Sequence, residues 1–185
     1  MEEEKELTLE EYIQQCRPYN INFTEDISEE SFLKFSKEVN DTNHILKRDL
    51  ILSSFGGSAR FIEPMSKIIE DGQINMFANF YICSAAFIIF FGTNTERQIM
   101  KNTVGMFHYP YLNGAALTPD NKIKTESEFD KLFYEKTKKY DEKFFKELLE
   151  IDSKTHKMLK EGGELVYNES QMKKLLKKSE KMFGN

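Results

Sequence analysis

The sequence predicts an α/β fold with a largely parallel β-sheet. Short segments rich in β-branched and aromatic residues alternate along the chain with segments whose apolar residues recur at helical spacing. Strands that alternate with helices favour parallel pairing, because a helix carries the chain back to the start of the next strand. Strands are expected at residues 21–24, 49–54, 74–81, 97–100, 104–108 and 164–167. Helices are expected at residues 28–39, 62–72, 84–91, 126–157 and 169–182.

The first elements follow an acidic N-terminal segment. Residues 1–18 are expected to form a short helix or arm that ends at Pro18, before the first strand at 21–24. Ser28 and Ser31 then occupy the N-cap and N3 positions of a helix, which is a capping-box arrangement without the usual glutamate at N3. Apolar residues at helical spacing predict that this helix packs on the core.

Glycines mark the ends of the elements in the middle of the chain. The strand at 49–54 runs into Gly56 and Gly57, and the helix that begins at Ile62 ends at Gly72. Residues 74–81 alternate loosely, as expected for a strand. Residues 84–91 are almost entirely apolar, which predicts a short buried helix.

The last third of the chain combines a loop with two charged helical segments. We expect a loop after Gly114, through Asp120, and then a long helix over 126–157 with an apolar face. The residues of that face are Phe129, Leu132, Phe133, Phe144, Phe145, Leu148 and Leu149. Gly162 and Gly163 end this part, before the strand at 164–167 and a final basic helix.

Composition favours one soluble domain. The 185 residues carry a net charge of −5, and 31% of them are charged, which does not favour a nucleic-acid partner. We expect an acidic arm at 1–19 and a single domain at 20–185. The late lysines are interpreted as solvated helix faces. Cys16 and Cys83 lack metal-ligand spacing, and the acidic start has no apolar core, so the prediction is a cytoplasmic protein without a signal peptide, metal or cofactor.

The apolar segment 76–92 is at the short limit for a membrane-spanning helix, which needs about 17–25 residues. Asn79 and Ser84 interrupt it, and β-favouring residues fill its first half. We therefore expect no membrane span.

Three features at predicted strand ends are candidates for chemistry. The Gly56-Gly57 pair allows close approach of the backbone to a ligand, although an ordinary glycine turn has the same pattern. Ser84 is at a strand–helix junction, where the Ala85 N–H can point with the serine Oγ; a simple N-cap serine is the alternative. His108 ends an apolar strand before a proline and is a candidate general base. His44 and His156 are in charged surroundings and are expected to be exposed.

The order of these motifs resembles that of the caseinolytic (Clp) protease proteolytic subunit over about residues 20–176. The stretch I-N-F-T-E-D-I-S-E-E-S is similar to the first strand and helix start of that family, and D-L-I-L-S-S-F-G-G-S to the strand before its S-P-G-G-S turn. C-S-A-A-F matches A-S-M-G-A-F. E-R-Q-I-M-K-N-T-V-G-M-F-H-Y-P matches, without a gap, the segment ending in M-I-H-Q-P, and E-L-V-Y-N-E-S-Q-M resembles D-R-F-L-S-A-P-E-A.

The resemblance implies a Ser–His–acid triad. Ser84 matches the nucleophile, His108 the general base and Glu164 the triad aspartate. Gly57 and Ala85 match the backbone donors of the oxyanion hole, and Gly56 supports the turn. Because Glu164 is longer than aspartate, Asp152 and Glu161 remain alternative acids, as does a Ser–His dyad. Cys83 is not expected to be the nucleophile.

The resemblance also implies a ClpP/crotonase-like core, a repeated β-β-α spiral with a protruding handle helix at 126–157. It implies a ring-forming homo-oligomer that cleaves unfolded polypeptides in a chamber, and it leaves open an ATP-dependent unfoldase as partner. Phe55 in place of proline and Ala85-Ala86 in place of Met-Gly depart from the family, and the serine segment is somewhat closer to signal peptide peptidases. Two alternatives remain: a catalytically impaired or regulatory ring subunit, and acyl-CoA chemistry on a crotonase-like fold.

Overall fold

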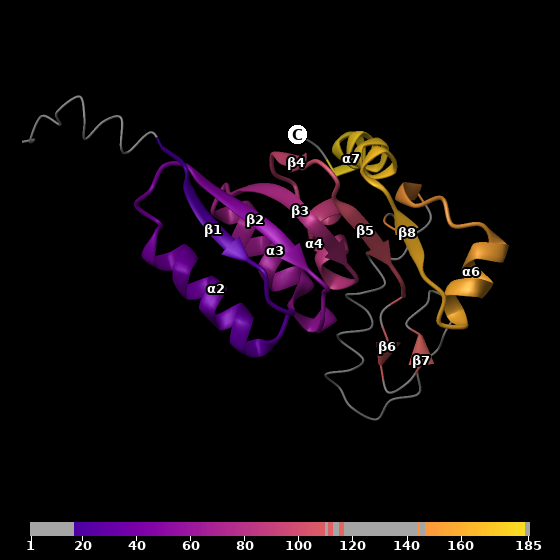
Figure 1. The fold of residues 1–185 in the computed structure, drawn as a ribbon. Helices are drawn as coiled ribbons and strands as arrows, with labels where there is room; N and C mark the ends of the chain where they lie inside the picture. Colours follow the sequence, from indigo (N-terminus) through magenta and orange to yellow (C-terminus); the bar gives the residue numbers. More distant parts are fainter. Residues whose placement is uncertain (1–16, 110, 113–114, 117–143, 145–146, 184–185) are drawn as a thin grey trace, which may run out of the picture.

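A computed structural model describes residues 17–109, 111–112, 115–116, 144 and 147–183 (Figure 1). A six-stranded sheet has the order β1-β2-β3-β5-β8, with β4 also paired to β3. The strands are β1 (Tyr19–Phe23), β2 (Arg48–Ser54), β3 (Asn75–Cys83), β4 (Arg97–Ile99), β5 (Val104–Phe107) and β8 (Leu165–Tyr167). The first five pair in parallel and β8 is antiparallel to β5, which confirms the expected largely parallel sheet.

Helices pack against this sheet and supply the rest of the core (Figure 1). They are α2 (Glu29–Asp41), α3 (Ile62–Asp71), α4 (Ala85–Gly92), α6 (Ser153–Lys160) and α7 (Glu169–Phe183), with a 3-10 turn at Ala59–Phe61. The expected cap of α2 is present, because Ser28 Oγ accepts from Ser31 N–H and Ser31 Oγ accepts from Ser28 N–H. Serine at N3 thus fills the place of the usual glutamate.

Helix α4 lies in the centre of the core. Its first seven residues, Ala85 to Phe91, are all buried. The Phe87 ring contacts those of Phe91, Phe107 and Tyr167, so helix, sheet and C-terminal strand share one aromatic cluster. This cluster explains the apolar character of the segment. In the described parts of the chain, no helix combines the length and the hydropathy that crossing a bilayer requires.

Arg97 ties the far end of α4 to its neighbours. Its Nη1 donates to the carbonyls of Phe90 and Phe91 and to Ser179 Oγ on α7. Those carbonyls belong to the last turn of α4, where helical backbone acceptors lack partners and a cation is favoured. Arg97 is 6% exposed, and burial lowers the pKa of its guanidinium.

Two sequence expectations are corrected. The loop expected after Gly114 does not begin there, because Ala115–Ala116 form strand β7, which pairs antiparallel with β6 (Tyr111–Leu112). The helix expected over 126–157 does not continue to its predicted end. Glu150 has a positive φ of 51°, and Asp152 caps a new helix, α6. The part of that stretch at 126–143, expected as a handle helix, lies outside the described residues.

Candidate functional site

Ser84 occupies a strained turn between β3 and α4. Its φ of 53° and ψ of −121° are unusual for a residue with a side chain. The side chain makes no cap hydrogen bond to the helix, so the simple N-cap interpretation is wrong. The backbone N–H donates instead to the Met106 carbonyl at 2.8 Å, which fixes the turn against β5. Ser84 is half-buried, and the strain is of the kind that surrounding structure must hold in place.

The glycine pair packs directly on this turn. Gly56 has a φ of 96°, and a Cβ there would lie 2.5 Å from the Cys83 carbonyl oxygen and 2.6 Å from Ser84 Cβ. Gly57 has a φ of 137°, and a Cβ there would lie 2.3 Å from the Ile27 carbonyl oxygen. Both positions therefore exclude any side chain, for reasons of backbone conformation and of space.

Two backbone N–H groups are the expected oxyanion donors, those of Gly57 and Ala85. Gly56 N–H donates to Ser54 Oγ, and the Gly56 carbonyl accepts from Ile27 N–H. Within the described residues, the N–H groups of Gly57 and Ala85 have no hydrogen-bond acceptor. Ala85 is also the first residue of α4, so its N–H lies at the positive end of the helix dipole.

His108 follows β5 on the strand next to Ser84. Cys83 and Met106 are register partners in parallel strands, so Ser84 and His108 emerge at the same edge of the sheet. His108 Nδ1 lies 2.7 Å from the Tyr109 carbonyl oxygen. A carbonyl only accepts, so we assign the proton to Nδ1, which leaves the lone pair of a neutral ring on Nε2. Nε2 is the nitrogen that a general base would use.

Glu164 precedes β8, and β8 pairs with β5, the strand that His108 follows. Phe107 pairs with Leu165 in antiparallel register, and one further step places Glu164 opposite His108. Its side chain is exposed and, within the described residues, makes no hydrogen bond. The negative charge of Glu164 nevertheless acts on Cys83, the residue before Ser84. Burial first, and the negative charge of Glu164 second, raise the pKa of the Cys83 thiol. A neutral buried thiol is a poor nucleophile, in line with the expectation for Cys83.

The alternative acids have other positions. Asp152 accepts from Thr155 N–H at 2.7 Å as the N-cap of α6, and this bond lowers the pKa of its carboxyl. Glu161 is the exposed C-cap residue of the same helix. Asp152 is therefore committed to a structural bond, and Glu164 is the acid whose register position faces His108.

Sequence reasoning missed a second histidine near the site. His156 on α6 is half-buried, contrary to the expected exposure, and its Nδ1 lies 2.7 Å from the Tyr109 hydroxyl. Tyr109 is 1% exposed. The two residues are 47 positions apart, so no local pattern could have joined them. The only sequence signal was an aromatic residue directly after His108.

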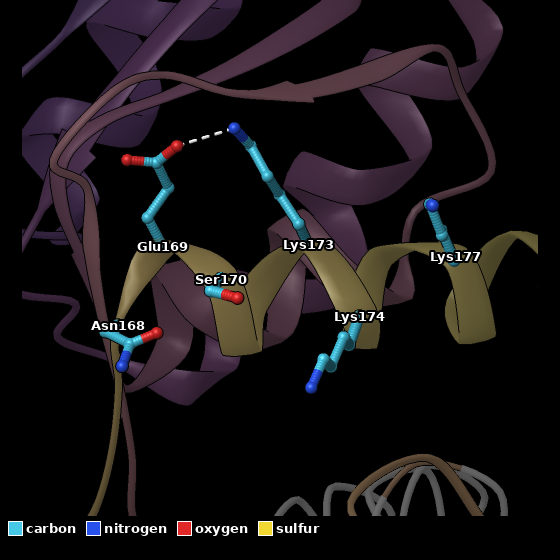
Figure 2. A pocket seen from close by; sticks show the side chains of 6 residues that line it. All are labelled: Asn168, Glu169, Ser170, Lys173, Lys174 and Lys177. Atoms are coloured by element: carbon cyan, nitrogen blue, oxygen red, sulfur yellow. Dashed lines mark hydrogen bonds and ion pairs between the residues drawn. The ribbon is translucent and has the colours of Figure 1, made fainter.

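Two hollows are lined by described residues other than these side chains. One of about 660 Å³ is lined by Asn168, Glu169, Ser170, Lys173, Lys174 and Lys177 of α7 and its N-cap region. Figure 2 shows Glu169 and Lys173 turned toward one another, with Lys174 pointing away, and the ion pair measures 2.6 Å. A second, of about 170 Å³, is lined by Asn20, Asp49, Ile51, Phe77, Asn79 and Met100.

Comparison with known proteins agrees with this architecture. No protein-family model matches the chain, and no curated protein matches its sequence significantly. Among solved structures, the chain is similar to the crystal structure of the ClpP protease catalytic domain from Plasmodium falciparum. The TM-score is 0.59 over 84% of this chain and 80% of that chain, with 15% sequence identity. The fold is ClpP-like.

The ClpP-like fold confirms the α/β class and the general resemblance seen in the motifs. At this identity the likeness concerns the path of the backbone, not the chemistry of individual side chains. Ser84, the glycine pair and His108 are therefore the features of this chain that favour a chemical function.

Proposed function

We propose that the protein is a serine-type peptidase with a ClpP-like fold, and that Ser84 is its nucleophile. The observation that carries the proposal is the strained Ser84 turn, which has a side chain free of any cap bond and is packed against Gly56. A structural serine at a helix start normally caps that helix. Strain held without a cap is typical of functional positions.

The proposed mechanism is acyl transfer in two halves. His108 Nε2 removes the Ser84 hydroxyl proton while Oγ bonds to the peptide carbonyl carbon, and the carbonyl oxygen becomes an oxyanion. The N–H groups of Gly57 and Ala85 hold that oxyanion. The C–N bond then breaks as His108 protonates the leaving amine. Water repeats the sequence on the acyl-enzyme and frees Ser84.

A catalytically impaired ring subunit is the second candidate. It is favoured by the exposed Glu164 carboxylate, which makes no hydrogen bond within the described residues. A carbonyl at Nδ1 stabilises the imidazolium formed during attack less than a carboxylate would.

A fluorophosphonate probe tests the proposed activity against this second candidate. We expect stoichiometric labelling of the folded protein, together with hydrolysis of a fluorogenic peptide. Both should be lost in Ser84→Ala and retained in Ser170→Ala, which changes an exposed serine of α7. A folded protein that is not labelled would favour the impaired subunit.

We also propose that the chain forms homo-oligomeric rings enclosing a chamber, with unfolded polypeptides as substrates and an ATP-dependent unfoldase as candidate partner. Support comes from apolar side chains on the sheet. Val104 and Val166 are exposed, and their register with Tyr81 and Met106 puts all four on one face. Exposed apolar surface of this kind is typical of protein contacts. The solution mass should be several times the chain mass of 21.8 kDa. A monomer at assay concentration would contradict the ring.

A further inference from the structure

We propose that Tyr109 and His156 are positioning residues that hold the His108 imidazole in the orientation and tautomer needed for base catalysis. The inference rests on the proposed function in one respect, the assignment of His108 as the general base. The contacts themselves do not depend on that assignment.

The group at His108 Nδ1 is a backbone carbonyl. In a Ser–His–acid triad, a carboxylate accepts from this nitrogen and orients the ring. Here the acceptor is the Tyr109 carbonyl, at 2.7 Å. A carbonyl has no net charge, but as an acceptor it selects the Nδ1–H tautomer and orients the ring. The direction of this carbonyl therefore helps to set the direction of Nε2.

The Tyr109 carbonyl is held in place by the burial of its own ring and by the proline that follows. The Tyr109 ring is 1% exposed and packs edge-on against Phe107, with ring centroids 5.9 Å apart at 84°. Because a proline follows Tyr109 in the sequence, its backbone is biased to extended conformations. A buried ring on a restricted backbone leaves the carbonyl little freedom to turn.

The buried Tyr109 hydroxyl is held by a histidine of α6. A buried tyrosine O–H needs a partner, and Tyr109 bonds His156 Nδ1 at 2.7 Å, with the rings at 70° to each other. His156 is in the middle of α6, whose start is capped by Asp152 and whose Leu159 is fully buried. The contacts thus run from α6 through Tyr109 to His108. They join the C-terminal part of the fold to the proposed base.

The variants separate hydrogen bonding from packing. Tyr109→Phe removes only the hydroxyl and keeps the ring. His156→Leu removes the imidazole partner, whereas His156→Gln supplies a side-chain amide that can bond the hydroxyl again. His44→Gln is the matched control, because His44 is exposed and in no element of the site.

Nitrogen NMR of the imidazole rings gives a readout that a merely structural role would not move. The chain has three histidines, so substitution of each one assigns the signals. We expect His108 to be mainly the Nδ1–H tautomer in the unmodified protein. We expect mixed tautomers in Tyr109→Phe and His156→Leu, recovery in His156→Gln and no change in His44→Gln. Fluorophosphonate labelling should fall about 10-fold in the first two variants, the lower end of the usual effect of such outer partners.

The two proposals fail in different ways. A His108 that is mainly Nε2–H, or that keeps its tautomer in a folded Tyr109→Phe protein, would overturn the positioning role even if Ser84 is labelled. The predicted tautomer pattern in a protein that the probe does not label would support the positioning role and overturn the peptidase proposal.

Discussion

The two sides of the candidate site are built differently. On the nucleophile side, Ser84, Gly56 and the buried helix α4 meet through backbone contacts that leave no space for substitution. On the base side, His108 depends on a neighbouring carbonyl, and Glu164 is exposed. The nucleophile side is thus determined by short-range backbone geometry, whereas the base side depends on Tyr109 and on His156 of α6. Substitutions on the first side should act strongly and locally, and those on the second should be graded.

The largest effect is expected from Gly56→Ala. The new methyl would meet the Cys83 carbonyl, and alanine disfavours a φ of 96°. We expect labelling of Ser84 to fall at least about 100-fold, as for loss of one oxyanion donor. Stability should drop by about 1–3 kcal/mol from the strain. Chemical denaturation and labelling of the folded fraction measure the two effects. Gly92→Ala, at the end of α4, is the control, and near-normal labelling in Gly56→Ala would contradict the tight packing.

Arg97→Met should affect stability more than activity. It removes the donor to the Phe90 and Phe91 carbonyls at the far end of α4. The Phe91 carbonyl keeps its bond from Ser179 Oγ, whereas the Phe90 carbonyl loses this donor. A buried acceptor left without a partner costs about 1–3 kcal/mol, and we expect a loss of that size in denaturant titration. Lys101→Met changes an exposed cation nearby and should cost little. If folded Arg97→Met loses labelling as fully as Gly56→Ala, the Ser84 turn is not independent of the far end of α4.

Glu164→Gln should have a small effect on labelling, less than about threefold, because the carboxylate is exposed and surface charges act weakly. It should also lower the pKa of the Cys83 thiol relative to the unmodified protein, because it removes a charge that raises it. Burial remains, so the pKa should stay above the ordinary value. Ultraviolet titration of the thiolate, in a Cys16→Ser background, measures this. A loss of labelling near that of Ser84→Ala would make Glu164 a full triad member.

Tyr167→Phe should leave the free energy of unfolding nearly unchanged at neutral pH. Burial against the α4 cluster raises the pKa of Tyr167 to about 12, above the ordinary 10.0. A folded-state pKa above the unfolded one means that stability holds below about pH 10 and falls as the pH rises toward 12, because the unfolded chain ionises first. Tyr167→Phe should reduce this alkaline loss in denaturation experiments between those pH values. An unchanged alkaline loss would contradict the burial of the phenol.

The same contrast explains what could be predicted from the sequence. The Ser28 cap, the Gly72 end of α3 and the Ser84 junction depend on neighbours in the sequence, and each was predicted within a residue or two. The Tyr109–His156 bond depends on contact between residues 47 positions apart, and it was missed. The break before α6 could not be predicted, because the residue with positive φ is Glu150 and no glycine or proline marks the position in the sequence.

The most direct test of the central claim is to locate the fluorophosphonate adduct by peptide mass spectrometry of the folded, full-length protein. We predict one adduct per chain, on the Ser84 Oγ, formed slowly or not at all after His108→Gln and absent in Ser84→Ala. An adduct on another residue, or a folded protein that stays unmodified while a known serine peptidase in the same sample is labelled, would contradict the claim that Ser84 is an activated nucleophile.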